Sequence, residues 1–370
     1  MRRIAELDGL RAIAILLVVA WHYLGTTAGP DSYMWRVFIL GRTGVDLFFV
    51  LSGYLITTIL LYNRASPSFF RSFYGRRSFR ILPIYYVMFG LYLLGVSMAW
   101  APVLFGGDVP EWTYAVGLQN VWMAIRQDYG ALWLGGTWSL AIEEQFYLVF
   151  PLIIRLVSVR SLPKILVCIM IVCPFARAIA GVLGDQYAYY VLMPMRADVL
   201  AVGALIAWVE FSGVITDVLK VRVRRTLIVT ACILPIFVLA IGKHTDRHMA
   251  IWGHTYLVAL YGSVLFTVLQ YQGSRILSVL RSVSARFFGD ISYALYLVHL
   301  NVWVLVSLSL GVARNVDTTT GAMVAAVSFA LSVAICAISY KFFERPLVRF
   351  AHKRFQYQKS APAGLRAAAE

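Results

Sequence analysis

The sequence predicts an all-α, polytopic membrane protein with about ten transmembrane helices in one bundle. Its 370 residues are 60% hydrophobic and only 14% charged, and the mean hydropathy of +0.75 excludes an ordinary soluble domain. Apolar runs of about twenty residues, the length that a helix needs to cross a bilayer, alternate with short basic loops. The predicted spans cover residues 10–28, 43–62, 81–101, 138–156, 163–183, 194–211, 226–242, 250–270, 288–310 and 321–343.

The distribution of positive charge predicts how these spans are oriented. A net charge of +15 could indicate nucleic-acid binding, but Lys and Arg gather in alternate loops and form no single patch. If the amino terminus is cytoplasmic, 25 of the 33 Lys and Arg residues fall on the cytoplasmic side, which is the positive-inside pattern. We therefore expect a multi-pass protein of the inner or plasma membrane, surrounded by lipid, with both termini cytoplasmic and no nucleic-acid partner. Nothing in the sequence indicates the oligomeric state.

The predicted membrane domain covers residues 1–346 and contains one long outer loop, residues 102–137. Aromatic residues at the headgroup level predict an interfacial helix over 112–126. The alternative, an eleventh span in this loop, would place the basic segment 155–164 outside and is disfavoured. Residues 347–370 are predicted to form a cytoplasmic tail that is largely disordered.

The first span contains two ionisable residues, Arg11 and His22. Because eleven residues make almost a whole number of helical turns, the two side chains share one face and lie about 16 Å apart along the axis. Ionisable groups inside a span are costly and by default suggest a functional site. The alternative for His22 is a hydrogen bond to a neighbouring helix with no further role.

Three further spans bring polar side chains to the depth of His22. Because buried charges must pair or face water, a shared hydrated cavity is predicted in the outer half of the bundle. Structural alternatives remain: Asp46 could pair with Arg42 or cap its helix, and Arg196 and Asp198 could each seek partners on other helices. Adjacent Glu143 and Glu144 point about 100° apart, so that only one is expected to face the cavity. The contributing residues are Asp46 from the second span, Trp138, Ser139, Glu143 and Glu144 from the fourth, and Arg196 and Asp198 from the sixth.

A second constellation is the predicted cytoplasmic segment FRSFYGRRSFRILP, in which arginines alternate with aromatic residues. Arg77 and Arg80 are three residues apart and share a face if the segment is helical. Arginine forks suit phosphate oxygens, and aromatic faces suit a purine. From charge alone, an anchor on anionic lipid is the competing interpretation.

The ninth span contributes a third constellation, FFGDISYALYLVHL, with His299 in the middle of the membrane. No partner for this histidine is visible in the sequence. A structural role is therefore the favoured interpretation of His299.

Seven segments, in order from residue 8 to residue 346, resemble the acyltransferase-3 family of integral membrane O-acyltransferases. They are DGLRAIAILLVVAWH, GVDLFFVLSGYLI, RRSFRILPIYY, TWSLAIEEQFYLVFP, RADVLAVGAL, GDISYALYLVHL and FFERP. By position, Arg11 and His22 match the family's essential pair, Arg77 and Arg80 its arginine motif, and Glu143 the glutamate of its Trp-Ser-Leu segment.

The resemblance implies an enzyme that moves an acyl group, commonly acetyl, from cytoplasmic acyl-CoA to a hydroxyl of an extracytoplasmic carbohydrate or glycoconjugate. Acetyl-CoA would be a donor substrate, with no permanently bound cofactor and no metal. Many relatives carry a hydrolase-like domain after the last span; this sequence has none, so we expect the membrane domain alone, or a partner protein, to engage the acceptor.

We expect His22 to act as the general base, oriented by Asp46 or Glu143 as in hydrolase triads, or else to carry the acyl group transiently. The alternative function is a transporter or flippase for a lipid-linked sugar or small solute, although the sequence shows no pseudo-repeat and no matching pair of broken spans. A membrane scaffold without catalysis is a third possibility. Arg11, Arg77 and Arg80 are expected to bind the donor, with Trp138, Ser139, Arg196 and Asp198 in supporting positions.

Overall fold

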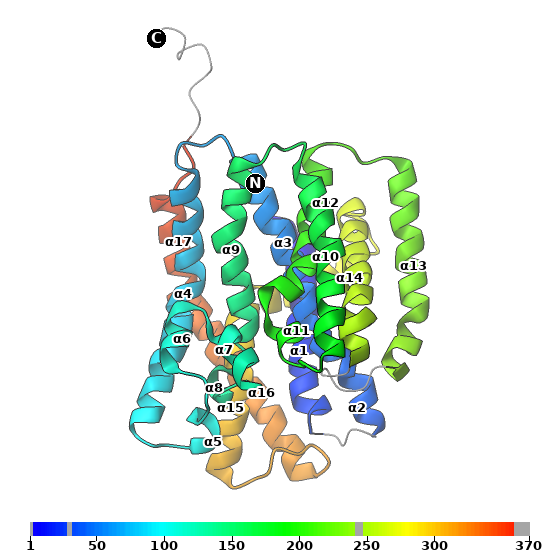
Figure 1. Ribbon diagram of the computed structural model, residues 1–370. Helices are drawn as coiled ribbons and strands as arrows, with labels where there is room; N and C mark the ends of the chain where they lie inside the picture. Colours follow the sequence, from blue (N-terminus) through cyan, green and yellow to red (C-terminus); the bar gives the residue numbers. More distant parts are fainter. Residues whose placement is uncertain (1–2, 28–31, 241–246, 359–370) are drawn as a thin grey trace.

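The computed structural model describes residues 3–27, 32–240 and 247–358, and over these ranges it contains helices and no β-strand. The all-α prediction is therefore confirmed, and a long helix coincides with every predicted span (Figure 1). The long helices are α1 (Ala5–Ala20), α3 (Gly44–Tyr62), α4 (Phe69–Ser97), α9 (Trp138–Leu156), α10 (Leu162–Val182), α12 (Met193–Phe211), α13 (Asp217–Ala240), α14 (His254–Gln270), α15 (Val283–Leu310) and α16 (Thr319–Ser339).

By length and apolar composition, eight helical stretches of the described chain can cross a membrane. Helices α9 and α13, at two of the predicted spans, are not among them, so the predicted count of about ten is approximate. The eight stretches are Ala5–Gly25, Trp35–Tyr62, Phe69–Ser97, Leu162–Val182, Ala188–Phe211, Met249–Gln270, Val283–Leu310 and Thr319–Arg354.

Shorter helices link or extend the long ones. Helix α1 passes directly into a π-helical turn, η1, which carries His22. These short elements are η1 (Trp21–Gly25), α2 (Tyr33–Phe38), η2 (Ile39–Thr43), α11 (Ala188–Val191), η3 (Met249–Gly253) and η4 (Ser278–Arg281).

Glycines allow the central helices to approach closely. Helix α1 packs between α3 and α15, and α3 packs along most of α12. A Cβ at Gly53 would lie 2.0 Å from the carbonyl oxygen of Leu200, and one at Gly203 would lie 2.1 Å from that of Val50. Such small-residue contacts favour helix association in lipid, where burial of apolar surface gives little driving force. They bring the polar groups of α3 and α12 within bonding distance of each other.

The long loop between α4 and α9 differs from its prediction. The expected single helix over 112–126 is two helices, because Gly117 adopts the left-handed conformation (φ 73°) that ends the first of them. Neither is long enough to cross a bilayer, which excludes an eleventh span here. The four helices of the loop are α5 (Pro102–Phe105), α6 (Glu111–Val116), α7 (Gln119–Arg126) and α8 (Leu132–Gly135).

The C-terminal segment is more ordered than predicted. After η5 (Tyr340–Glu344), α17 (Arg345–Arg354) packs beside the start of α4 (Figure 1). The chain then continues along α4: Arg76 Nε donates to the carbonyl oxygen of Phe355 (2.6 Å), and Ser72 Oγ donates to that of Gln356 (2.8 Å). The predicted disorder is therefore wrong up to residue 358, and residues 359–370 lie outside the described part of the chain.

Candidate active site

Three cavities follow one another along α1 and its continuation η1. The first, about 670 Å³, surrounds the arginines of α4 and is called the basic cavity here. The second is a narrow throat of about 100 Å³ that shares Arg11, Arg77 and Arg80 with the basic cavity. The third, about 560 Å³, contains His22 and is called the histidine cavity. The basic cavity and the throat thus share lining residues, whereas the histidine cavity shares none with the throat.

The basic cavity holds guanidinium groups with different degrees of pairing. Arg3 binds both Asp8 and Asp290 at 2.5 Å, and Arg11 lies 3.5 Å from Asp8. Within the described residues, no carboxylate lies within salt-bridge distance of the other arginines of this cavity, Arg76, Arg77 and Arg80. The cavity thus presents three guanidinium groups that form no direct ion pair with a described carboxylate.

An aromatic ring already lies on one of these arginines. Tyr357 lies 4.9 Å from the guanidinium of Arg76, and both residues line the basic cavity. Burial raises the pKa of Tyr357 to about 12, so its hydroxyl is neutral at physiological pH. The cavity therefore accommodates a planar ring stacked on a cation.

The throat contains Glu143, which accepts hydrogen bonds from Ser52 Oγ (2.7 Å) and Tyr147 OH (2.8 Å). Of the two adjacent glutamates only this one lines the throat, as expected from their 100° separation. Glu144 faces a separate side cavity of about 280 Å³. Glu143 thus lies beside Arg11 and Arg77, on the arginine side of the site.

A hydrogen-bonded partition separates the throat from the histidine cavity. Ser139 and Tyr296 line the throat, and their hydroxyls lie 2.6 Å apart. Tyr296 also donates to the carbonyl oxygen of Gly136 (2.9 Å), a residue that lines the histidine cavity. Trp138, which directly precedes Ser139, also lines the histidine cavity. The start of α9 therefore forms the wall between the throat and the histidine cavity.

His22 is paired with His299. Its Nδ1 lies 2.9 Å from His299 Nε2, and His299 Nδ1 lies 2.7 Å from the carbonyl oxygen of Leu295. Because a carbonyl only accepts, Nδ1 of His299 must donate, so its Nε2 accepts when the ring is neutral. His22 Nδ1 is then the donor, and the lone pair of His22 Nε2 is left for chemistry in the histidine cavity.

The predicted partners of His22 are elsewhere, which corrects the expectation that Asp46 or Glu143 orients it. In the described chain neither carboxylate bonds His22. Asp46 forms an ion pair with Arg196 at 2.5 Å and lies 3.7 Å from His254 Nδ1. The close packing of α3 on α12 explains this choice, because it places the second span directly against the sixth.

Asp198 is also bound to another helix and does not contact His22 in the described chain. Both of its oxygens accept from Arg177 of α10 at 2.8 Å, and the arginine is completely buried. Arg196 also bonds the ring of His254. Asp46, Arg196 and Asp198 thus belong to a buried ionic network that joins α3, α10, α12 and α14. Sequence reasoning missed Arg177 and His254, although both are ionisable residues within predicted spans, which is the signal that could have found them.

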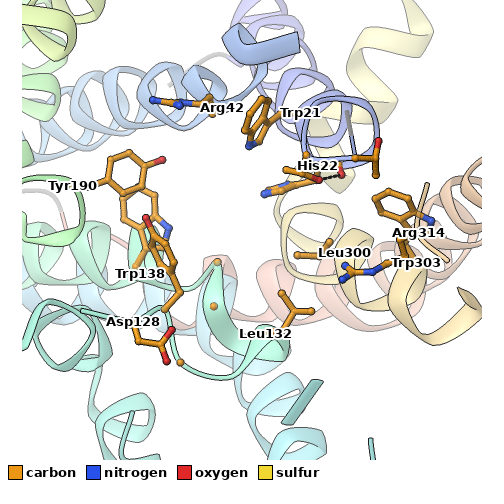
Figure 2. A pocket seen from close by; sticks show the side chains of 16 residues that line it. Trp21, His22, Arg42, Asp128, Leu132, Trp138, Tyr190, Leu300, Trp303 and Arg314 are labelled. Carbon is orange, nitrogen blue, oxygen red and sulfur yellow. Dashed lines mark hydrogen bonds between the residues drawn. The ribbon is translucent and has the colours of Figure 1, made fainter. Parts of the chain in front are cut away.

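The walls of the histidine cavity are aromatic and cationic. Figure 2 shows His22 between two arginines, Arg42 with Trp21 on one side and Arg314 with Trp303 on the other. Each guanidinium carbon lies 5.9 Å from the centre of its tryptophan ring. Burial lowers the pKa of Arg314. Trp138 and Tyr190, whose ring centres are 4.6 Å apart, close the cavity on another side together with Asp128. Neither Arg42 nor Arg314 was predicted as a site residue.

Comparisons with known proteins agree with this architecture. Residues 4–341 match a family model described as an acyltransferase domain. The chain is 27% identical to O-acetyltransferase OatA of Staphylococcus aureus, with 96% of the chain and 59% of the relative covered. It is also 27% identical to the peptidoglycan O-acetyltransferase OatA of Listeria monocytogenes (98% and 60% covered). Identity to the putative peptidoglycan O-acetyltransferase YrhL of Bacillus subtilis is 29% (94% and 55% covered). The chain thus spans less than two thirds of the length of these relatives, and no solved structure matches it significantly.

Proposed function

Because this chain belongs to the acyltransferase-3 family, we propose that it transfers an acyl group, acetyl by default, from acyl-CoA to a hydroxyl of a carbohydrate of the cell envelope. Relatives over nearly the whole chain are O-acetyltransferases, and two are named for peptidoglycan, which supports a glycan acceptor. The multi-pass helical bundle is consistent with donor and acceptor reaching the site from opposite sides of a membrane.

The charge distribution supports a cytoplasmic position for the basic cavity. Its arginines belong to loops and helix ends that carry most of the positive charge, as the positive-inside rule requires. The histidine cavity then opens toward the extracytoplasmic side. In this orientation acyl-CoA enters at Arg77 and Arg80, and the acceptor enters beside His22.

The donor fits the basic cavity by its charges. Arg77 and Arg80 are the guanidinium groups without a described acidic partner that border both cavity and throat, so they are placed for the phosphates of CoA. The stacking of Tyr357 on Arg76 indicates that an adenine ring could use the same kind of surface. The thioester arm would extend through the throat, past Arg11 and Glu143, toward the histidine cavity.

The transfer step needs a base for the acceptor hydroxyl, and His22 Nε2 is available for it. The hydroxyl gives its proton to Nε2 while its oxygen attacks the thioester carbonyl. The carbon–sulfur bond then breaks, the ester forms, and the leaving sulfur recovers the proton from His22. His299 accepts the hydrogen bond from Nδ1–H and stabilises the imidazolium that exists between these two events.

Glu143 takes a positioning role in this scheme. Its carboxylate lines the throat with Arg11 and Arg77 and is fixed by Ser52 and Tyr147. It can hold these arginines in place around the donor arm, and it has no bond to the base. An acyl-His22 intermediate would use the same Nε2 and the same throat.

The observation that carries the proposal is the succession of three cavities from the arginine cluster to His22, with only the hydrogen-bonded pair Ser139 and Tyr296 between the last two. The test uses purified protein with radiolabelled acetyl-CoA and a panel of cell-wall glycans. Wild-type protein should label a glycan, and His22→Ala should abolish labelling while leaving expression and the elution profile unchanged. Retained transfer in that variant would refute the role of His22, and solute uptake into vesicles without any acyl chemistry would favour a transporter.

A further inference from the structure

Arg42 has an unusual environment for a buried arginine. It is 7% exposed, and neither terminal nitrogen of its guanidinium has a hydrogen-bond partner among the described residues. Buried arginines elsewhere in this bundle, Arg177 and Arg196, bind carboxylates directly. An uncompensated buried cation is costly, so a partner that enters from outside the chain would stabilise the site.

Neighbouring groups do not satisfy this arginine. Asp46 lies one helical turn further along the chain, but its carboxylate is bound by Arg196. Trp21 stacks on the guanidinium at 5.9 Å, and this contact involves the face of the group, whereas its N–H bonds point outward in the plane. The edge of Arg42 that recognises anions is therefore unoccupied by described groups, and the residue lines the histidine cavity.

The packing of two short turns places Arg42 in the cavity that contains the base. Gly41 lies so close to α1 that a Cβ there would be 2.3 Å from the carbonyl oxygen of Leu17 and 2.8 Å from the Cβ of Trp21. Arg42 follows this contact on η2, and His22 follows Trp21 on η1. The same close approach that requires glycine at position 41 thus packs together the turns that carry Arg42 and His22, and Trp21 lies between these two side chains (Figure 2).

We propose that Arg42 binds a carboxylate on the acceptor, so that the enzyme acts on a sugar bearing an acidic group. This inference rests on the proposed function and specifies its acceptor class. The two terminal nitrogens match the two oxygens of a carboxylate in a bidentate pair. A phosphate carries more negative charge than a carboxylate, so Asp128 in the same cavity would repel a phosphate more strongly. Arg314, across His22, adds positive charge, and the tryptophans offer apolar faces to a sugar ring.

Binding of matched sugars to the purified 370-residue chain tests this assignment. The probes are the methyl glycosides of glucuronic acid and N-acetylmuramic acid, the methyl ester of each, and N-acetylglucosamine 6-phosphate, titrated by saturation-transfer NMR. Charge-assisted hydrogen bonds predict that each acid binds about 10- to 100-fold more tightly than its ester. In Arg42→Gln this preference should disappear, and Arg42→Lys should retain part of it. Arg36→Gln removes the same charge from an exposed position of α2 and should change nothing.

Equal binding of acid and ester to the wild-type protein, or an unchanged preference in Arg42→Gln, would overturn the assignment. Tighter binding of the phosphate than of either acid would refute the carboxylate in favour of a phosphate. Should Arg42→Gln fail to fold, the wild-type preference and its partial loss in Arg42→Lys decide the question. His22→Ala should keep the preference and lose acyl transfer, which separates this inference from the proposed function. Wild-type protein that discriminates the probes but transfers no acyl group would refute only the latter.

Discussion

Replacement of His299 by Leu removes the hydrogen bond between His22 Nδ1 and His299 Nε2 while keeping an apolar side chain in the bundle. The lost interaction is a hydrogen bond between imidazoles at 2.9 Å, and its importance grows when His22 becomes positively charged in the proposed transfer step. Hydrogen bonds to charged groups contribute about 1.5–3 kcal/mol. At 1.36 kcal/mol for each factor of ten, kcat should fall about 10- to 150-fold.

The expected loss is smaller than that caused by removing a carboxylate from a hydrolase triad, about 10⁴-fold, because a neutral ring stabilises an imidazolium less than an anion does. The KM for acyl-CoA should change little, since the arginines of the basic cavity are untouched. His299→Gln, whose amide can both accept from His22 and donate to the Leu295 carbonyl, should recover part of kcat. Steady-state transfer of radiolabelled acetyl groups measures each value.

A purely structural role for His299 would give a different pattern. The variant would then elute as an aggregate or lose thermal stability, and Gln and Leu would be equally defective. Full activity of a well-folded His299→Leu protein, together with inactivity of His22→Ala, would refute the histidine pair as the arrangement that orients the base.

Two further predictions concern the donor and the buried network. Arg77→Glu together with Arg80→Glu should weaken acyl-CoA binding by at least tenfold in isothermal titration, and added salt should weaken wild-type binding, because the contact is with phosphates. Asp198→Leu leaves the guanidinium of Arg177 buried without its carboxylate, so it should destabilise the protein by about 3–5 kcal/mol and lower the midpoint of thermal unfolding, whereas Arg177→Met combined with Asp198→Leu should restore much of that stability.

Matched controls make both results interpretable. Arg71→Glu reverses a charge on the same helix at an exposed position that does not line the basic cavity, and it should leave acyl-CoA affinity unchanged. Unchanged affinity in the double Arg77 and Arg80 variant would return these arginines to a lipid-anchoring role. A double Arg177 and Asp198 variant no more stable than the single one would show that the pair is not an isolated ionic unit.

The fold was largely predictable because a bilayer leaves few alternatives. Every span requires about twenty apolar residues with internally bonded backbone, and this requirement is visible in sequence without any partner. The single helix predicted over 112–126 is interrupted at Gly117. An interfacial segment does not have to cross the bilayer, so the length requirement of a span gives no information about where its helices end. Phe355 and Gln356 are held along α4 because the side chains of Arg76 and Ser72 donate hydrogen bonds to their backbone carbonyl oxygens. The composition of the C-terminal segment does not indicate these bonds.

The sequence identified candidate residues for the site, but it could not predict which way their side chains face. The sequence predicts a similar depth for His22, on a span that runs outward, and for Asp46 and Asp198, on spans that begin outside. The direction of each side chain depends on helix rotation and on the neighbouring helices. Asp46 therefore pairs with Arg196, and His22 bonds His299, which is 277 positions away in the sequence. His299 was judged structural because its partner belongs to a distant span. Arg42 was considered only as a partner for Asp46, and the pairing of that carboxylate elsewhere is what makes the arginine notable.

The narrow partition formed by Ser139 and Tyr296 also bears on the energetics of the membrane in which the protein resides. Two wide cavities that joined through an open bore would let protons and small ions leak down their electrochemical gradient. A throat of about 100 Å³, crossed by two hydroxyls 2.6 Å apart, leaves little room for a continuous file of water between the cavities. A thin acyl-bearing arm could occupy such a passage where a hydrated ion could not, so group transfer across the bundle need not dissipate the membrane potential.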